Sequence, residues 1–169
     1  MPILRFTSKL QARLFSNLSH EEDFEDKERV ETVRIKGLNG EFNLAGNFFE
    51  SVGGSETFKK LVDKFYEGVA TDDILRPMYP EEDLGPAAER LQLFLEQYWG
   101  GPTTYQEQRG HPRLRMRHQP YKINPLARER WLHHMRIAVE SIALPKLLEA
   151  ELWAYLDRAA TAMLNTFED

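Results

Sequence analysis

The sequence Arg-Gly-His-Pro-Arg-Leu-Arg-Met-Arg-His occupies residues 109–118 and is the most informative stretch of this chain. A Gly-His-Pro break opens it, and a short basic segment then runs to a histidine, His118. The helical pattern before the stretch ends in Tyr98 and Trp99, and the pattern after it carries Trp131. The stretch therefore predicts an imidazole at the end of a short helix, with aromatic side chains on both flanking helices.

This arrangement has two interpretations. A histidine that ends a short helix among aromatic side chains suits an iron porphyrin that the protein ligates from one side. A basic run is equally typical of a solvated helix face or of a phosphate contact. Spacing alone does not separate the two, so the choice depends on the rest of the chain.

The bulk composition excludes several classes of protein. The chain has 169 residues, 41% of them hydrophobic and 11% aromatic, which predicts one ordered domain with a sizeable core. The net charge of −5 argues against a general nucleic-acid-binding protein. The absence of cysteine excludes disulfides, thiolate metal sites and covalent haem attachment, and it fits a cytoplasmic protein. No apolar run is long enough to cross a bilayer.

Residues 1–43 differ from the rest and are predicted to form an N-terminal extension. Residues 1–20 carry bases but no acid, with apolar residues at roughly helical spacing, whereas residues 21–31 carry seven acids and two bases. Residues 33–42 have little helical pattern. A basic amphipathic start is typical of a transit peptide or of a helix on a membrane surface, and it also fits an arm that packs on the body or stays disordered.

Residues 44–169 are predicted to form an all-α domain. Apolar residues recur at helical spacing, and each helical pattern is bounded by a break or a capping signal. Gly53-Gly54-Ser55-Glu56 supplies a break and an N-cap candidate, and Pro77 and Pro80 bracket a tight corner. The remaining signals are Gly100-Gly101-Pro102, which ends a helix, and Asn124-Pro125 and Pro145, which each begin one.

The sequence lacks the motifs of several other chemistries. It has no glycine-rich phosphate loop and no nucleophile elbow. Its carboxylates are scattered along helical patterns, as solubility requires. His133 and His134 are adjacent, so on a helix they point about 100° apart and do not easily share a metal. Neither histidine is given a role.

Five motifs occur in an order that resembles the truncated haemoglobins. These are small globins with a two-over-two helical sandwich, and the likeness is to their group II, over roughly residues 47–167. Gly110–His118 resembles the family signature that ends in the proximal histidine. The other four motifs, in chain order, are the paired aromatics Phe65-Tyr66, the corner aromatic Tyr79, the glycine-rich helix end Gln97–Pro102 and the helical tryptophan Trp131.

The resemblance implies haem b (iron protoporphyrin IX), held without covalent bonds. His118 is then the proximal ligand, since a neutral imidazole offers one nitrogen lone pair to iron. Its other ring nitrogen is expected to donate to a backbone carbonyl or a similar partner, which would fix the ring. Met116 is expected to lie against the porphyrin on the same side.

The resemblance also implies a distal pocket and a solvent edge. Ala87 stands where globins often place histidine, so donors for a bound ligand are expected from Tyr66, Tyr79 and Trp131. Leu91 and Phe94 are expected as apolar walls. The candidates for contact with the haem propionates are Arg90, Tyr98 and Arg117. The remaining arginines of the signature stretch, which are expected to be solvated or to contact a reductase, are Arg109, Arg113 and Arg115.

The function that this implies is reversible binding of O2, CO or NO, with a strong donor set that suits sensing, scavenging or redox chemistry. Peroxide reduction and an NO dioxygenase-like reaction are the enzymatic alternatives, each with an unidentified reductase. The absence of a distal histidine disfavours an efficient peroxidase, because no general base is evident. A cofactor-free helical interaction module is the alternative from a different class. The oligomeric state does not follow from the sequence.

Overall fold

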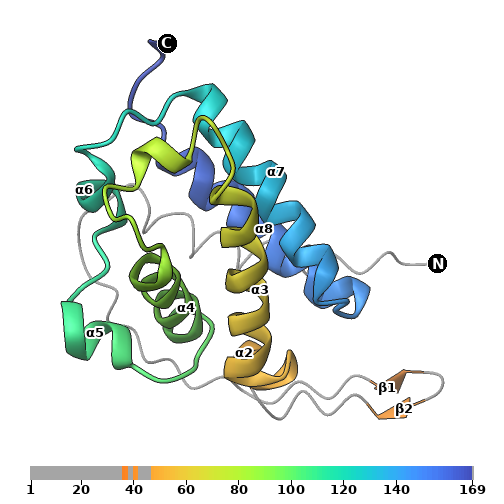
Figure 1. Cartoon of the computed structure of the whole chain (residues 1–169). Coiled ribbons are helices and arrows are strands. Elements are labelled where there is room, and N and C mark those ends of the chain that lie inside the picture. The colour runs from red at the N-terminus through yellow and green to blue at the C-terminus, as the bar shows by residue number, and fades with distance from the viewer. Residues whose placement is uncertain (1–35, 38–39, 42–46, 169) are drawn as a thin grey trace. The chain divides into compact units, whose positions relative to one another are not determined.

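The computed structural model describes residues 36–37, 40–41 and 47–168 (Figure 1). Two short antiparallel strands, β1 (Lys36–Gly37) and β2 (Gly40–Glu41), lie within the predicted extension. They pair Lys36 with Glu41 and Gly37 with Gly40, in the segment whose sequence lacks a helical pattern. The other predictions for residues 1–43 lie outside the described residues.

Residues 47–168 form an all-helical domain, as predicted. No described residue in this range belongs to a strand. The α-helices are α2 (Phe48–Ser51), α3 (Gly54–Val69), α4 (Gly85–Tyr98), α5 (Thr104–Arg109), α6 (Leu114–His118), α7 (Pro125–Ser141) and α8 (Lys146–Ala162), and the corner between α3 and α4 holds the 3-10 helix η1 (Arg76–Met78).

Most helix boundaries follow the local signals in the sequence. Asn124 caps α7 by accepting the amide of Ala127 at 2.9 Å, and Pro125 is the first helical residue. The predicted break before α3 is present, and within it the cap is Gly53, which makes no side-chain cap bond. Gly53 has a φ of 102°, which glycine adopts more readily than other residues. A Cβ there would also lie 2.8 Å from the Thr57 hydroxyl oxygen, so the turn into α3 requires glycine.

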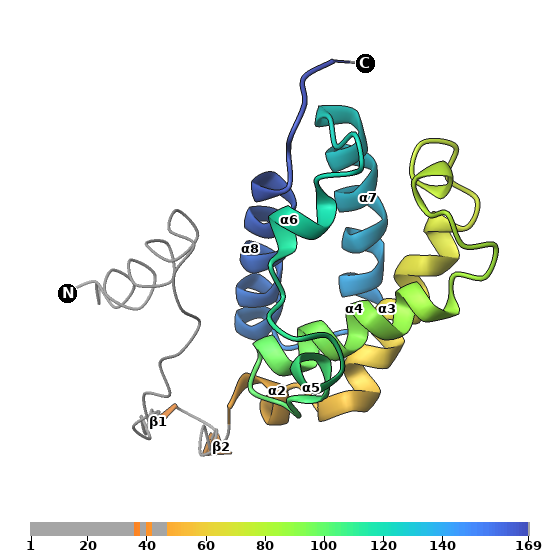
Figure 2. The same cartoon turned by 90° about the vertical axis from the view of Figure 1, so that its left-hand side faces the viewer.

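The domain is a two-over-two sandwich. Helix α3 packs on both α4 and α7, and α7 packs beside α8, which Figure 2 shows from the side. The side chains between these layers are buried almost completely, and burial of each contributes roughly 1.5–3 kcal/mol. The largest of them are Phe58, Leu61, Phe65, Leu95, Met135, Leu152 and Leu156.

Candidate functional site

His118 is the last residue of α6, and its ring is held by its own helix. Nδ1 lies 2.7 Å from the carbonyl oxygen of Leu114, one turn earlier. A carbonyl oxygen can only accept, so Nδ1 carries the proton and Nε2 keeps its lone pair. The side chain is half-buried. This is the carbonyl partner that the sequence analysis expected, and it leaves one ring nitrogen available to a metal.

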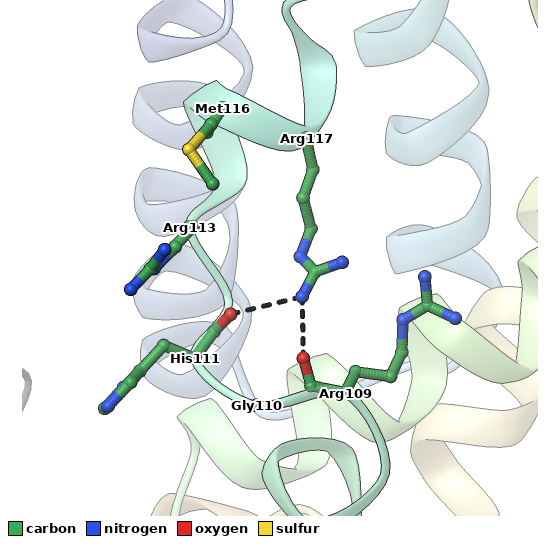
Figure 3. A pocket seen from close by; sticks show the side chains of 6 residues that line it. All are labelled: Arg109, Gly110, His111, Arg113, Met116 and Arg117. Atoms are coloured by element: carbon green, nitrogen blue, oxygen red, sulfur yellow. Dashed lines mark hydrogen bonds between the residues drawn. The ribbon is translucent and has the colours of Figure 1, made fainter.

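Arg117 fixes the loop that leads into α6. Its Nε donates to the Pro112 carbonyl at 2.8 Å, and a terminal nitrogen donates to the carbonyls of Arg109 at 2.7 Å and His111 at 3.4 Å (Figure 3). The loop needs such support because Arg113, which precedes α6, has a φ of 41°, a strained value for a residue with a side chain. Arg117 thus holds the backbone that positions His118.

Asn165 fixes the other side of α6. Its side-chain nitrogen donates to the carbonyls of His118 at 3.2 Å and Tyr121 at 2.8 Å. Its side-chain oxygen accepts the amide of Ile123 at 2.9 Å. The segment after α8 therefore closes the turn that follows the histidine. Sequence reasoning missed Asn165, which lies 47 residues from His118.

Met116 lies on a different face of α6 from His118. It stands two positions before His118 on the helix, which turns the two side chains about 200° apart. Met116 is 55% exposed and, with Arg113 and His111, lies on the side of the loop away from Arg117 (Figure 3). The expectation that it lies against the porphyrin stays a prediction. It lines an open hollow of about 390 Å³ formed by Arg109, Gly110, His111, Arg113, Met116 and Arg117.

The predicted distal aromatics form one connected cluster. The ring of Phe65 lies 5.0 Å from that of Tyr66 and 5.3 Å from that of Trp131, and the Tyr66 and Tyr79 rings lie 5.6 Å apart. Burial is the main cause that raises the pKa of Tyr66, and Tyr79 raises it further. Burial also raises the pKa of Tyr79. Both hydroxyls therefore keep their protons at neutral pH and remain donors.

Helix α4 supplies an apolar wall. Ala87 is 3% exposed, and its methyl group neither donates nor accepts a hydrogen bond. Leu91 and Phe94 are half-buried and pack against the core, one and two turns later. The face therefore presents hydrocarbon, and its role as the wall of a haem pocket stays a prediction.

The remaining propionate candidates, Arg90 and Tyr98, have partners within the chain. Arg90 donates to a carboxylate oxygen of Glu81 at 2.9 Å. Tyr98 stacks on Tyr155 of α8, with ring centroids 3.9 Å apart, and burial raises its pKa. Neither contact was anticipated from the sequence.

The most heavily bonded side chain of the region is one that the sequence analysis overlooked. Asp72, whose side chain is fully buried, accepts the amides of Ile74 at 2.9 Å and Leu75 at 2.8 Å. It also accepts Nε of Arg130 at 2.8 Å and Nε2 of His134 at 2.7 Å. Burial acts to raise the pKa of Asp72, but these hydrogen bonds and the Arg130 charge outweigh it and lower the pKa to about 2.

A local signal for this site did exist. An aspartate just past a helix, two residues before a new turn, favours a bond from its carboxylate to the following amides. Arg130 and His134 are four residues apart on α7 and therefore share a face. No local pattern could indicate that Asp72 contacts His134, because 62 residues separate the two in the sequence.

The donor set fits a porphyrin better than a bare metal ion. Within the described residues, no group of three or more histidine, aspartate or glutamate side chains could hold a metal ion. A porphyrin brings four nitrogen ligands of its own and needs only one or two from the protein. One imidazole with a free nitrogen matches that need, and the same domain supplies an apolar helix face and a cluster of protonated donors. No helix among the described residues is long and apolar enough to cross a membrane.

Comparisons with known proteins agree with this geometry. The family described as bacterial-like globin matches residues 47–165. The group 2 truncated haemoglobin YjbI of Bacillus subtilis is 39% identical over 115 residues, which cover 68% of this chain and 86% of that protein.

Two solved structures extend the likeness to the fold. The thermostable haemoglobin of Thermobifida fusca is 66% identical, with a TM-score of 0.72 over 73% of this chain and 100% of that one. The truncated oxygen-avid haemoglobin of Bacillus subtilis is 38% identical, with a TM-score of 0.67 over 71% of this chain and 100% of that one. The chain therefore belongs to the bacterial-like globin family and is a group II truncated haemoglobin, a haem-binding globin.

Proposed function

We propose that this globin binds haem b without covalent bonds, through Nε2 of His118, and that it retains O2 tightly. CO and NO are ligands of the same site. The observation that carries the proposal is the hydrogen bond from His118 Nδ1 to the Leu114 carbonyl, which fixes the ring and leaves Nε2 as the only nitrogen able to ligate. When bound, haem supplies an iron centre with an open position for a diatomic molecule.

The protein supplies orientation, exclusion of water and hydrogen-bond donors. Arg117 and Asn165 hold the two ends of α6 and so keep His118 in place. Ala87, Leu91 and Phe94 line the opposite wall with hydrocarbon. Tyr66, Tyr79 and Trp131 offer two hydroxyls and an indole N–H, each worth about 0.5–1.5 kcal/mol to a ligand that accepts a hydrogen bond.

Tight retention of the ligand favours sensing, scavenging or redox chemistry over delivery. A carrier must release oxygen readily, whereas three donors around the pocket oppose release. The Bacillus subtilis haemoglobin with 38% identity is described as oxygen-avid, which supports the same behaviour here. Turnover of NO or peroxide, with electrons from a reductase, remains the enzymatic alternative. The apolar Ala87 disfavours peroxidase chemistry that needs a distal base.

The ligand assignment is tested by His118→Ala. We expect this variant to lose stoichiometric haem binding or to bind iron with altered ligation, which absorbance spectra of the ferrous–CO form would report. The matched control is His111→Ala, because His111 belongs to the same signature stretch and is exposed. A His118→Ala protein with an unchanged ferrous–CO spectrum would contradict the assignment.

A further inference from the structure

Asp72 lies outside the proposed haem site, yet it joins the elements that carry all three distal donors. Its four hydrogen bonds come from the corner after α3, through Ile74 and Leu75, and from α7, through Arg130 and His134. Arg130 also pairs with Asp73 at 3.0 Å, which adds a second, exposed contact between the same two elements.

The bonded groups are close in sequence to the distal donors. On α7, Arg130 directly precedes Trp131, and His134 follows it by three residues. On the other side, Asp72 follows Tyr66 by six residues. The corner that it caps continues from Leu75 into η1, directly after which Tyr79 stands. A shift of α7 relative to this corner would therefore move Trp131 relative to the two tyrosines.

Gly68 shows how closely α3 and α7 approach at this point. A Cβ at position 68 would overlap the His134 ring, coming within 2.7 Å of its Cγ. The imidazole therefore packs directly on the α3 backbone, two residues beyond Tyr66. Because a carboxylate can only accept, Nε2 of His134 carries the proton that it donates to Asp72. The ring is thus fixed both by packing and by a hydrogen bond.

We propose that Asp72, acting through Arg130 and His134, is a positioning residue that sets the Trp131 indole relative to the Tyr66 hydroxyl and thereby slows the release of O2. The proposal rests on the function proposed above, in which these two side chains are ligand donors. A buried carboxylate with four donors has one well-defined geometry, because any displacement leaves a charged oxygen unpaired. Such a group suits a site in which donors must be aligned.

The test is Asp72→Asn in the haem-loaded protein. An amide has one accepting oxygen in place of two, so it cannot serve Arg130, His134 and both backbone amides together. We expect O2 to dissociate about three- to tenfold faster, as loss of alignment of about one hydrogen bond implies. We also expect the ¹⁵N–¹H resonance of the Trp131 indole to move in the CO complex, which reports its surroundings without reference to O2 kinetics.

Asp157→Asn is the matched control. Asp157 also accepts a hydrogen bond from an arginine of α7, Arg128, at 2.6 Å, but it lies on α8, and among the described residues it has no hydrogen bond or ion pair to the corner after α3. We expect the control to leave both the O2 dissociation rate and the Trp131 resonance unchanged. If Asp72→Asn does not fold, Arg130→Gln tests the same alignment. It removes one donor to Asp72, and the Arg130 side chain is 41% exposed.

Two results would overturn the inference. One is an Asp72→Asn protein with reduced stability but a wild-type Trp131 resonance and O2 dissociation rate, which would make Asp72 purely structural. The other is an Asp157→Asn protein that changes both readouts equally. Failure of the proposed function can be told apart from failure of this inference. If the donors do not bind the ligand, Trp131→Phe and Tyr66→Phe leave O2 release unchanged. The Trp131 resonance in Asp72→Asn then still reports whether Asp72 positions the indole.

Discussion

At the scale of single residues, the site depends on which ring atoms remain available. His118 gives Nδ1 to a carbonyl and keeps Nε2, whereas His134 gives Nε2 to a buried carboxylate. The two histidines differ in the nitrogen that donates, so each ring keeps its lone pair on the other one. Nδ1 of His134 lies against the α3 backbone at Gly68, so that ring serves as a fixed donor.

Trp131→Phe tests the donor role of the indole. Phenylalanine keeps much of the bulk beside Phe65 but removes the N–H, so we expect O2 to dissociate about two- to tenfold faster. Stopped-flow measurement of O2 release checks this. Trp153→Phe is the control, since Trp153 lies on α8 under the guanidinium of Arg136, 5.0 Å away. Equal rates for Trp131→Phe and the wild type would refute a bonding role.

At the scale of elements, two short connections need more support than their helices provide. Arg76 donates to the carbonyls of Tyr79, Glu81 and Glu82, each at 3.0 Å, and so holds the corner before α4. Arg117 does the same for the loop before α6. In both places an arginine satisfies carbonyl groups that no helix uses, which keeps an irregular segment in one conformation.

The hydrogen bonds by which Asp72 joins helix α7 to the corner after α3 are expected to weaken in acid. The pKa of Asp72 is lowered from 3.8 to about 2, so the folded state binds this proton less readily than the unfolded chain. The ionised carboxylate therefore contributes roughly 2 kcal/mol to the free energy of unfolding above about pH 4. This contribution is lost as the pH falls through about 2. Urea unfolding from pH 5 to pH 2 should show that loss in the wild type but not in Asp72→Asn. Parallel pH curves for the two proteins would contradict the assignment.

Local signals in the sequence predicted most element boundaries. Asn124-Pro125 and Pro145 act within one turn of themselves, so their helix starts were readable. The cap of α3 falls at Gly53, inside the predicted stretch, where a positive φ turns the backbone without a side-chain bond.

At the scale of the whole molecule, the family and the two-over-two fold were predicted correctly, because five ordered motifs constrain one topology. The contacts of the candidate site were less accessible. Asp72 with His134 and His118 with Asn165 each join residues more than forty positions apart, and neither pair has a spacing rule. Such pairs exist only after the helices have packed.

Deletion of residues 1–43 tests the predicted boundary of the globin domain. The buried core among the described residues runs from Val52 to Ala160. We therefore expect the shortened chain to fold and to take up haem. Its thermal midpoint, measured by circular dichroism, should lie within a few degrees of that of the full chain, which corresponds to a change in stability of about 1 kcal/mol or less. An insoluble or haem-free product would show that residues 1–43 belong to the fold.

The role of Asn165 has a practical consequence for handling the protein. This residue lies beyond α8 and is bonded to the backbone of the histidine that we propose as the iron ligand. We expect a purification tag or a sensor surface attached directly beyond residue 165 to disturb that bond and, through it, the position of the proposed ligand. Ligand affinities measured on a chain immobilised at that end would then carry a bias that an attachment ahead of residue 47 avoids.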